Sequence, residues 1–174
     1  MAGQDGNVSA RIGPDRVLVT PAGISKVDAA PRGLVELSLD GRVRGTRRGV
    51  PSSEVQLHLD AYRARPDIRA VVHAHPPIAT AFAVAGEALD DDQLAELKYG
   101  VGRVPVVPFA PPGSPELAQR VATFLVSHDA VLLAHHGAVT VGPSVLVAHQ
   151  RMESVEHAAR ILLVAQHVKR SNST

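Results

Sequence analysis

The residues that could do chemistry in this chain are histidines near the ends of apolar segments. Residues 70–77 (AVVHAHPP) place His73 and His75 on either side of one alanine. Alternate side chains of a β-strand point to the same face, so the spacing predicts two imidazoles side by side. A lone buried histidine is usually a hydrogen-bonded core residue, whereas a pair on one face favours a shared ligand such as a metal ion.

A second apolar segment, residues 132–139 (LLAHHGAV), ends in His135 and His136, and Gly137 lets the backbone turn or pass close to another segment. Adjacent strand residues face opposite ways, so only one of the two can join the first pair. Three imidazoles from two strand ends can bind one divalent ion and leave a position open, as in catalytic zinc sites. The sequence has no cysteine, so the other ligands available to a metal are carboxylates and water.

Residues 51–56 (PSSEVQ) have two interpretations. Ser53 and Gln56 match a capping box, and Glu54 near a helix start gains ~0.3–1 kcal/mol from the helix dipole. A helix start with two hydroxyls is also a candidate anion site, and the glycine-containing loops DGNVSAR and TPAG could add backbone N–H groups for a phosphate. The chain has neither a P-loop nor a strand-linked Gly-x-Gly-x-x-Gly motif, which disfavours nucleotide binding.

The elements that must position these residues alternate between short strands and helices. Apolar patterns and turn residues predict strands at 16–20, 69–74 and 103–109, a hairpin of 34–39 with 41–44, and one buried strand interrupted by glycine within 130–142. Helices are predicted over 51–65, 76–86, 113–128 and 143–169. Ser114 is the predicted N-cap of the third helix.

Composition predicts one cytoplasmic domain. The 174 residues carry 18 basic and 17 acidic side chains, a balance that argues against a nucleic-acid partner. No segment approaches the ~20 apolar residues of a membrane span, and the polar start does not resemble a signal peptide. We therefore expect neither a nucleic acid nor a membrane as partner.

Six segments, taken together in order and spacing, resemble the class II aldolase and adducin family, and within it the L-fuculose-phosphate aldolase type. They are GNVSAR (6–11), TPAGISK (20–26), PSSE (51–54), HLDAYRARPDIRAVVHAHPP (58–77), PFAPPGSPEL (108–117) and LLAHHGAVTVG (132–142). The resemblance implies an α/β fold, a three-layer α/β/α sandwich around a central, mainly antiparallel sheet. It also implies a single domain over residues 1–174 and a homotetramer with active sites at subunit interfaces. This chain departs from the family pattern at its start, where the expected N-terminal helix before Gly6 is missing.

The resemblance assigns roles to individual residues. It implies a divalent metal, Zn²⁺ first and Mn²⁺, Co²⁺ or Fe²⁺ otherwise, on His73, His75 and His136, with Glu54 as the catalytic acid/base. Its phosphate-binding positions match Asn7, Gly23, Ser52 and Ser53, with Lys26 as a weaker candidate. The family's interface tyrosine aligns near Leu94, and Tyr99 is the nearest tyrosine. The implied activity is metal-dependent cleavage of a phosphorylated ketose, such as L-fuculose 1-phosphate, through an enediolate.

Several alternatives stay open from the sequence. Epimerases, dehydratases and decarboxylases of the family share the metal site, although SSE rather than SSD disfavours the epimerase branch. A non-catalytic scaffold like the adducin head has no physical need of all three histidines together with Glu54. His58, one turn after Glu54, either orients it or packs in the core. The cluster of histidines and glutamates on the last helix is interpreted as a solvated face rather than a second metal site; it comprises His149, Glu153, Glu156 and His157.

Overall fold

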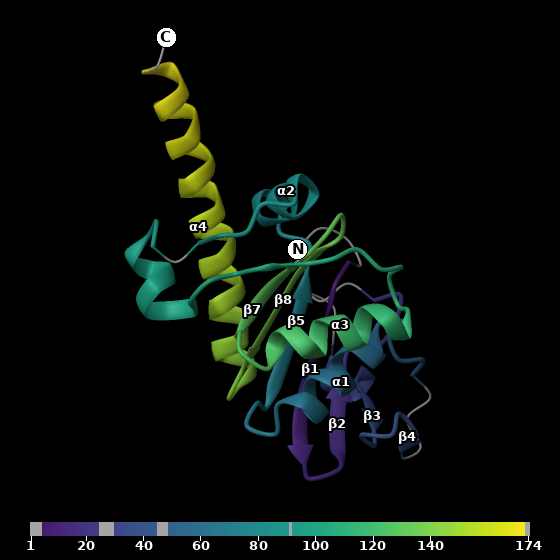
Figure 1. Ribbon diagram of the computed structural model, residues 1–174. Coiled ribbons are helices and arrows are strands. Elements are labelled where there is room, and N and C mark those ends of the chain that lie inside the picture. Colours follow the sequence, from purple (N-terminus) through teal and green to yellow (C-terminus); the bar gives the residue numbers. More distant parts are fainter. Residues whose placement is uncertain (1–4, 25–29, 45–48, 91, 173–174) are drawn as a thin grey trace.

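The computed structural model describes residues 5–24, 30–44, 49–90 and 92–172 (Figure 1). In this part of the chain, eight strands form one sheet in the order β4-β3-β2-β1-β5-β8-β7-β6. The strands are β1 (Asn7–Gly13), β2 (Arg16–Val19), β3 (Val35–Leu37), β4 (Val43–Arg44), β5 (Ala70–Ala74), β6 (Val106–Val107), β7 (Ala130–Leu133) and β8 (Gly137–Gly142). Neighbours pair antiparallel except β6 with β7, which confirms the predicted mainly antiparallel sheet.

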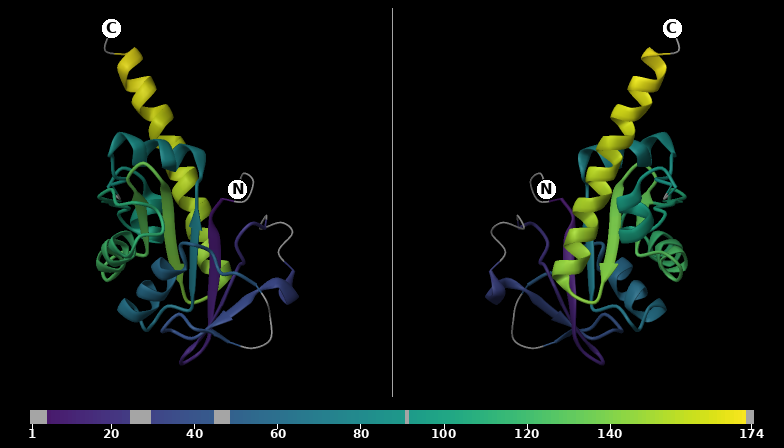
Figure 2. Two further views of the ribbon diagram at one scale, coloured as in Figure 1. Left: turned by 90° about the vertical axis from the view of Figure 1, so that its right-hand side faces the viewer. Right: turned by 90° about the vertical axis from the view of Figure 1, so that its left-hand side faces the viewer.

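Helices cover both faces of the sheet, as the predicted three-layer α/β/α sandwich requires. The helices are η1 (Pro31–Gly33), α1 (Val55–Ala64), α2 (Pro77–Ala85), η2 (Leu97–Val101), α3 (Pro115–Leu125) and α4 (Val145–Ser171). Helices α1 and α3 share one apolar core with the sheet, and α2, η2 and α4 share the other. The C-terminal half of α4 extends beyond the sheet (Figures 1 and 2). No helix in the described part of the chain combines the length and apolar character needed to cross a membrane.

Strand β5 lies in the middle of the sheet and is buried on both faces, which explains its continuous apolar run. Val71 packs into the core under α1 and α3, whereas Val72 and Ala74 pack into the core under α2 and α4. His73 therefore lies on the Val71 side, facing α1. The predicted alternation across Ala74 is confirmed, because the alanine and the histidine point into different layers.

Three predicted segments differ from the structure. The GNVSAR segment was expected as a glycine-containing loop, but it begins the central strand β1, whose Asn7 and Ser9 pair with His73 and Val71. Residues 130–142 were expected as one strand, but they form the hairpin of β7 and β8, joined by a turn over residues 134–136. The strand expected at 103–109 is reduced to β6 and an isolated bridge between Leu89 and Val104.

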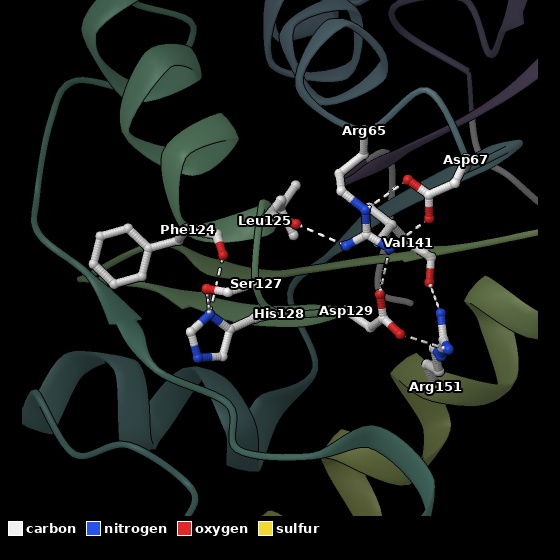
Figure 3. A network of polar contacts seen from close by, with 9 residues as sticks. All are labelled: Arg65, Asp67, Phe124, Leu125, Ser127, His128, Asp129, Val141 and Arg151. Carbon is white, nitrogen blue, oxygen red and sulfur yellow. Dashed lines mark hydrogen bonds and ion pairs between the residues drawn. The ribbon is translucent and has the colours of Figure 1, made fainter.

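A network of hydrogen bonds and ion pairs links the elements at the end of the sheet where β5 and β7 begin (Figure 3). Arg65, which follows α1, donates to the Leu125 carbonyl at 2.8 Å and to Asp129 at 3.1 Å, and it also pairs with Asp67. Arg151 of α4 binds the same Asp129 carboxylate at 2.6 Å. The network links α1, α3, β7 and α4, while the candidate site lies at the other end of these strands.

Candidate functional site

Three histidines converge at the end of β5 and the turn before β8. The rings of His73, His75 and His136 form a nearly equilateral triangle, with centroids 4.8–4.9 Å apart. One ring nitrogen from each lies within 4.8 Å of the others. The structure therefore brings together the three histidines that the resemblance assigns to a metal, and their binding of a metal stays a prediction.

The triangle fits a metal ion. The Nδ1–H of His73 donates to the Ala138 carbonyl at 2.9 Å, which leaves the Nε2 lone pair for a ligand bond, the usual arrangement at metal-binding histidines. The Nε2 atoms of His73 and His75 are 3.1 Å apart. Tetrahedral coordination at ordinary zinc–nitrogen lengths separates two nitrogens by about 3.3 Å. The three histidines are therefore a candidate metal site within the described part of the chain.

Glu54 faces this triangle. Its Oε2 lies 3.2 Å from His73 Nε2 and its Oε1 lies 3.3 Å from His136 Nε2. Burial raises the pKa of Glu54, but His73 and His136, when they carry an additional proton, and the Asn7 hydrogen bond outweigh it and lower the pKa to about 2. The carboxylate is therefore ionised near neutral pH and can accept a proton.

His136 is neutral near neutral pH. Burial and the charge of His73 lower its pKa to about 4, although Glu54 acts in the opposite direction. A neutral imidazole keeps the lone pair that a metal ion requires. Its Nδ1 is buried and has no hydrogen-bond partner among the described residues.

Two glycines allow the backbone segments that carry the site to come close together. A Cβ on Gly6, whose φ is +74°, would lie 2.4 Å from the His73 carbonyl oxygen. A Cβ on Gly137 would lie 2.6 Å from the Ala74 carbonyl oxygen and 2.7 Å from His75 Cδ2. The expected close approach at Gly137 is confirmed, and it brings the histidine turn against the end of β5.

The turn over residues 134–136 decides which of the adjacent histidines joins the site. His135 takes a left-handed conformation with φ 58° and packs edge-on against Phe109, with ring centroids 6.0 Å apart. His136 bonds through its backbone N–H to the Leu133 carbonyl at 3.0 Å and turns its ring towards Glu54. The expectation that only one of the two histidines joins the pair is confirmed, although a turn and not a strand separates their directions.

The residues predicted to bind phosphate lie in neighbouring loops. The amide of Asn7 donates to Ser52 Oγ at 3.0 Å and to Glu54 Oε2 at 3.1 Å, so both of its hydrogens are used within the protein. The bridge between Pro21 and Pro51 places the turn that holds Gly23 beside the loop of Ser52 and exposed Ser53. Their role in binding phosphate stays a prediction, and Lys26 lies outside the described residues.

The predicted capping box is wrong. Helix α1 begins at Val55, so Glu54 and not Ser53 occupies the N-cap position, and Glu54 makes no side-chain cap bond. The Gln56 side chain donates to Asp60 at 2.8 Å, so it does not bond back to Ser53. Ser52 Oγ accepts from the Glu54 N–H at 3.3 Å. The Glu54 carboxylate points at the histidines. A residue that only stabilised the helix dipole would instead point to solvent.

Buried polar residues lie behind Glu54. The sequence indicated His58 either as a residue that orients Glu54 or as a core residue, but it did not predict Ser9 and Tyr62 as its polar neighbours. His58 contacts Asn7 and Ser9 and does not bond Glu54 directly, and Ser9 also bonds Tyr62. Polar residues alternating along a buried strand, with histidine and tyrosine four residues apart on a helix, are the signal that could have indicated this contact.

The histidine and glutamate cluster on α4 lines a separate cavity of about 510 Å³ that borders His75. Glu156 accepts from the backbone N–H groups of Ile78 and Ala79 and so caps α2. His149 Nδ1 lies 3.5 Å from Glu153 on exposed helix surface. The exposed His149–Glu153 pair agrees with the interpretation of a solvated face. Glu156 differs from it, because its carboxylate binds the first backbone N–H groups of α2.

Comparison with known proteins agrees with this geometry. The family model of the class II aldolase and adducin N-terminal domain matches residues 1–163. A 3-oxo-tetronate 4-phosphate decarboxylase of Haemophilus influenzae is 33% identical over 169 residues, which are 94% of this chain and 79% of that protein. A 5-methylthioribulose-1-phosphate/5-deoxyribulose-1-phosphate aldolase of Rhodospirillum rubrum is 34% identical over 157 residues, 90% of this chain and 70% of that protein.

A solved L-fuculose 1-phosphate aldolase superposes with a TM-score of 0.90 at 31% identity, covering 97% of this chain and 79% of that one. The α/β architecture is thus that of a class II aldolase. The family model and these relatives cover most of the chain, and the relatives are lyases. The chain therefore belongs to the class II aldolase and adducin family.

Proposed function

We propose that this chain is a metal-dependent lyase that acts through the enediolate of a three-carbon ketose phosphate, and that it cleaves a phosphorylated ketose such as L-fuculose 1-phosphate. The observation that carries the proposal is the position of Glu54. Its carboxylate oxygens lie 3.2 and 3.3 Å from the Nε2 atoms of two of the three converging histidines. A proton-transferring group next to a candidate Lewis-acid site is the arrangement that enolate chemistry needs.

The substrates in the relatives' names lead to one common species. Cleavage of a 1-phosphoketulose between C3 and C4 leaves the electron pair on C3, as the enediolate of dihydroxyacetone phosphate, and releases an aldehyde. Loss of carbon dioxide from a 3-oxo-tetronate 4-phosphate leaves the same enediolate. Either reaction ends when the enediolate carbon takes up a proton, so the shared product is dihydroxyacetone phosphate.

In this proposal His73, His75 and His136 hold the divalent ion, with Zn²⁺ as the first expectation and Mn²⁺, Co²⁺ or Fe²⁺ as alternatives. When bound, the ion supplies Lewis-acid stabilisation of negative charge on the substrate oxygens. Glu54 moves the proton at the enediolate carbon. Its Oε2 accepts from Asn7, while the buried Oε1 accepts no hydrogen bond from the described residues, and we assign the proton transfer to Oε1.

The loops next to Glu54 form the proposed phosphate site. Gly23, Ser52 and Ser53 offer backbone N–H groups and hydroxyls at the neighbouring turns, and Asn7 fixes Ser52 relative to Glu54. Anchoring the phosphate away from the reacting carbon holds that carbon in reach of the proton-transferring group. The phosphate therefore serves orientation, and a substrate without it should react poorly.

Deuterium exchange tests the proposal without knowledge of the aldehyde. The metal-loaded wild-type protein should exchange one C–H proton of dihydroxyacetone phosphate in D₂O, followed by NMR. Glu54→Gln should slow exchange at least about 100-fold, the usual contribution of a general base, and keep its metal. Exchange at the wild-type rate in Glu54→Gln would remove Glu54 as the base.

The decarboxylase is the second candidate, favoured by the 33% identity with the 3-oxo-tetronate 4-phosphate decarboxylase. Incubation with that acid and with L-fuculose 1-phosphate, followed by coupled detection of dihydroxyacetone phosphate, separates the two. Release from the acid alone makes the chain a decarboxylase, and release from the sugar phosphate alone makes it an aldolase. A protein that releases the product from neither substrate and exchanges no proton would instead support a scaffold.

We further propose a cytoplasmic homotetramer with active sites at the subunit interfaces. Large apolar side chains are exposed on this subunit, with Tyr99 84%, Leu146 66% and Phe109 53% accessible. Light scattering should give four times the chain mass of 18.3 kDa. A monomeric mass in an active preparation would contradict the interface sites.

A further inference from the structure

Four buried polar side chains form an unbroken hydrogen-bonded series behind Glu54. The Tyr62 hydroxyl lies 2.9 Å from Ser9 Oγ, and Ser9 Oγ lies 2.7 Å from His58 Nδ1. The other ring nitrogen, His58 Nε2, contacts Asn7 Oδ1. Tyr62, Ser9, His58 and Asn7 are each at most 2% exposed, so water does not compete for these bonds.

The direction of each bond follows from the Asn7 amide. Its nitrogen donates to Ser52 Oγ at 3.0 Å and to Glu54 Oε2 at 3.1 Å, and its oxygen lies against His58 Nε2. An amide oxygen only accepts, so His58 must carry its proton on Nε2. Its Nδ1 then accepts from the Ser9 hydroxyl, and Ser9 accepts from Tyr62. Only one arrangement of protons satisfies the whole series.

We propose that His58 is a positioning residue for the acid/base, which fixes the Asn7 amide so that Asn7 holds Glu54 Oε2 and Ser52 Oγ at once. The inference rests on the proposed role of Glu54. If the amide turned over, the Asn7 oxygen would face a carboxylate oxygen at 3.1 Å, and two acceptors repel. One amide thus joins the proton-transferring group to the proposed phosphate loop, and His58 decides which way that amide points.

The surroundings of His58 keep it in the required form. Burial, with a smaller effect of the charge on His73, lowers the pKa of His58 to about 3 against the opposing effect of Glu54. The ring is therefore neutral, with one donor and one acceptor. A His58 that only stabilised the fold would make the same bonds. The experiment must therefore distinguish an effect on the orientation of Asn7 and Glu54 from an effect on the free energy of unfolding.

His58→Leu and His58→Gln provide that separation in the metal-loaded full chain. Leucine removes both ring nitrogens, whereas the glutamine amide can still donate to Asn7. Deuterium exchange into dihydroxyacetone phosphate should fall 10–100-fold in His58→Leu, the usual cost of losing such a partner, and recover by most of that factor in His58→Gln. Metal content should stay at the wild-type level in both variants.

Thr140→Val is the matched control. Thr140 is fully buried and donates to the Ala148 carbonyl at 2.7 Å on the other face of the sheet. The substitution therefore removes a comparable buried hydrogen bond away from the site. It should lower the urea midpoint and leave exchange within twofold of wild type. Equal slowing in Thr140→Val and His58→Leu, or no recovery in His58→Gln, would overturn the positioning role.

A measurement on the wild-type chain keeps the inference testable if His58→Leu does not fold or the proposed function fails. Imidazole ¹⁵N NMR, with the His58 signals assigned by their absence in His58→Gln, should show Nε2 protonated and Nδ1 unprotonated at pH 7. The Nδ1–H tautomer or an imidazolium would overturn the inference. Failure of the wild type to exchange dihydroxyacetone phosphate would instead contradict the proposed function and leave the tautomer result standing.

Discussion

Gly137 sets how closely the histidine turn approaches β5. Because its Cβ would lie 2.6 Å from the Ala74 carbonyl oxygen, a Gly137→Ala substitution must shift the backbone that carries His136. We expect a loss of about 1–3 kcal/mol in the free energy of unfolding and weaker metal binding. Gly33→Ala, where a Cβ meets nothing within 4 Å, is the control and should change neither. Urea unfolding and metal titration measure both, and an unchanged Gly137→Ala would show that the turn tolerates the shift.

The sequence predicted the pair of site histidines on one strand face, but it did not predict how the third histidine or the residues behind Glu54 are oriented. The spacing of His73 and His75 predicted their common face because β-strand geometry is local. The orientation of His136 depends on a turn in which His135 takes φ 58°, and local patterns do not encode that choice. The Asn7–His58 contact joins a strand and a helix 51 residues apart, so the pattern within either element alone does not identify it.

The Arg65 network links α1, α3, β7 and α4 at the end of the sheet opposite the site. Arg65→Met would remove its bonds to Asp67, Leu125 and Asp129. Bonds to charged groups that are partly buried typically contribute about 1.5–3 kcal/mol, so we expect a loss of that size in the free energy of unfolding, with metal content unchanged. Arg103→Met removes an exposed pair with Asp90 and should cost less than about 1 kcal/mol. A metal-free Arg65→Met variant would show that the two ends of the sheet are coupled.

At the element scale, strongly patterned helices were predictable and the sheet only in part. Ser114 caps α3 by accepting from Leu117 at 3.1 Å, as predicted, and α4 covers most of its expected range. The sequence did not predict strand β1, because its buried residues Asn7 and Ser9 are polar and bond to other polar groups. A buried strand face normally shows apolar side chains. The hairpin of β7 and β8 reads as a single apolar run, since both strands are buried on both faces.

The free energy of unfolding of the whole molecule should decrease as the pH drops below neutrality. An unfolded histidine takes up a proton below its ordinary pKa of 6.5, whereas folded His58 does so only near 3. The unfolded state therefore binds more protons in that window, and the free energy of unfolding falls as pH drops, by up to about 1.4 kcal/mol per pH unit from His58. The lowered pKa of His136 adds to the fall.

Urea unfolding of metal-free protein at pH 6.5, 6.0 and 5.5 measures this slope. His58→Gln should show a smaller slope than wild type because glutamine does not titrate. Equal slopes in the two proteins would contradict the neutral, buried state of His58.

We propose that His73, His75 and His136 form one metal site beside Glu54, and metal content per chain is the direct measurement of that site. Protein purified without chelator or a metal-binding tag should carry about one divalent ion per chain, measured by plasma mass spectrometry. His135→Asn, which changes the adjacent histidine that packs on Phe109, should keep that ion, and His136→Ala should lose it. A wild-type protein that stays metal-free after incubation with Zn²⁺, Mn²⁺, Co²⁺ or Fe²⁺, or a His136→Ala variant that retains a full equivalent, would contradict the account.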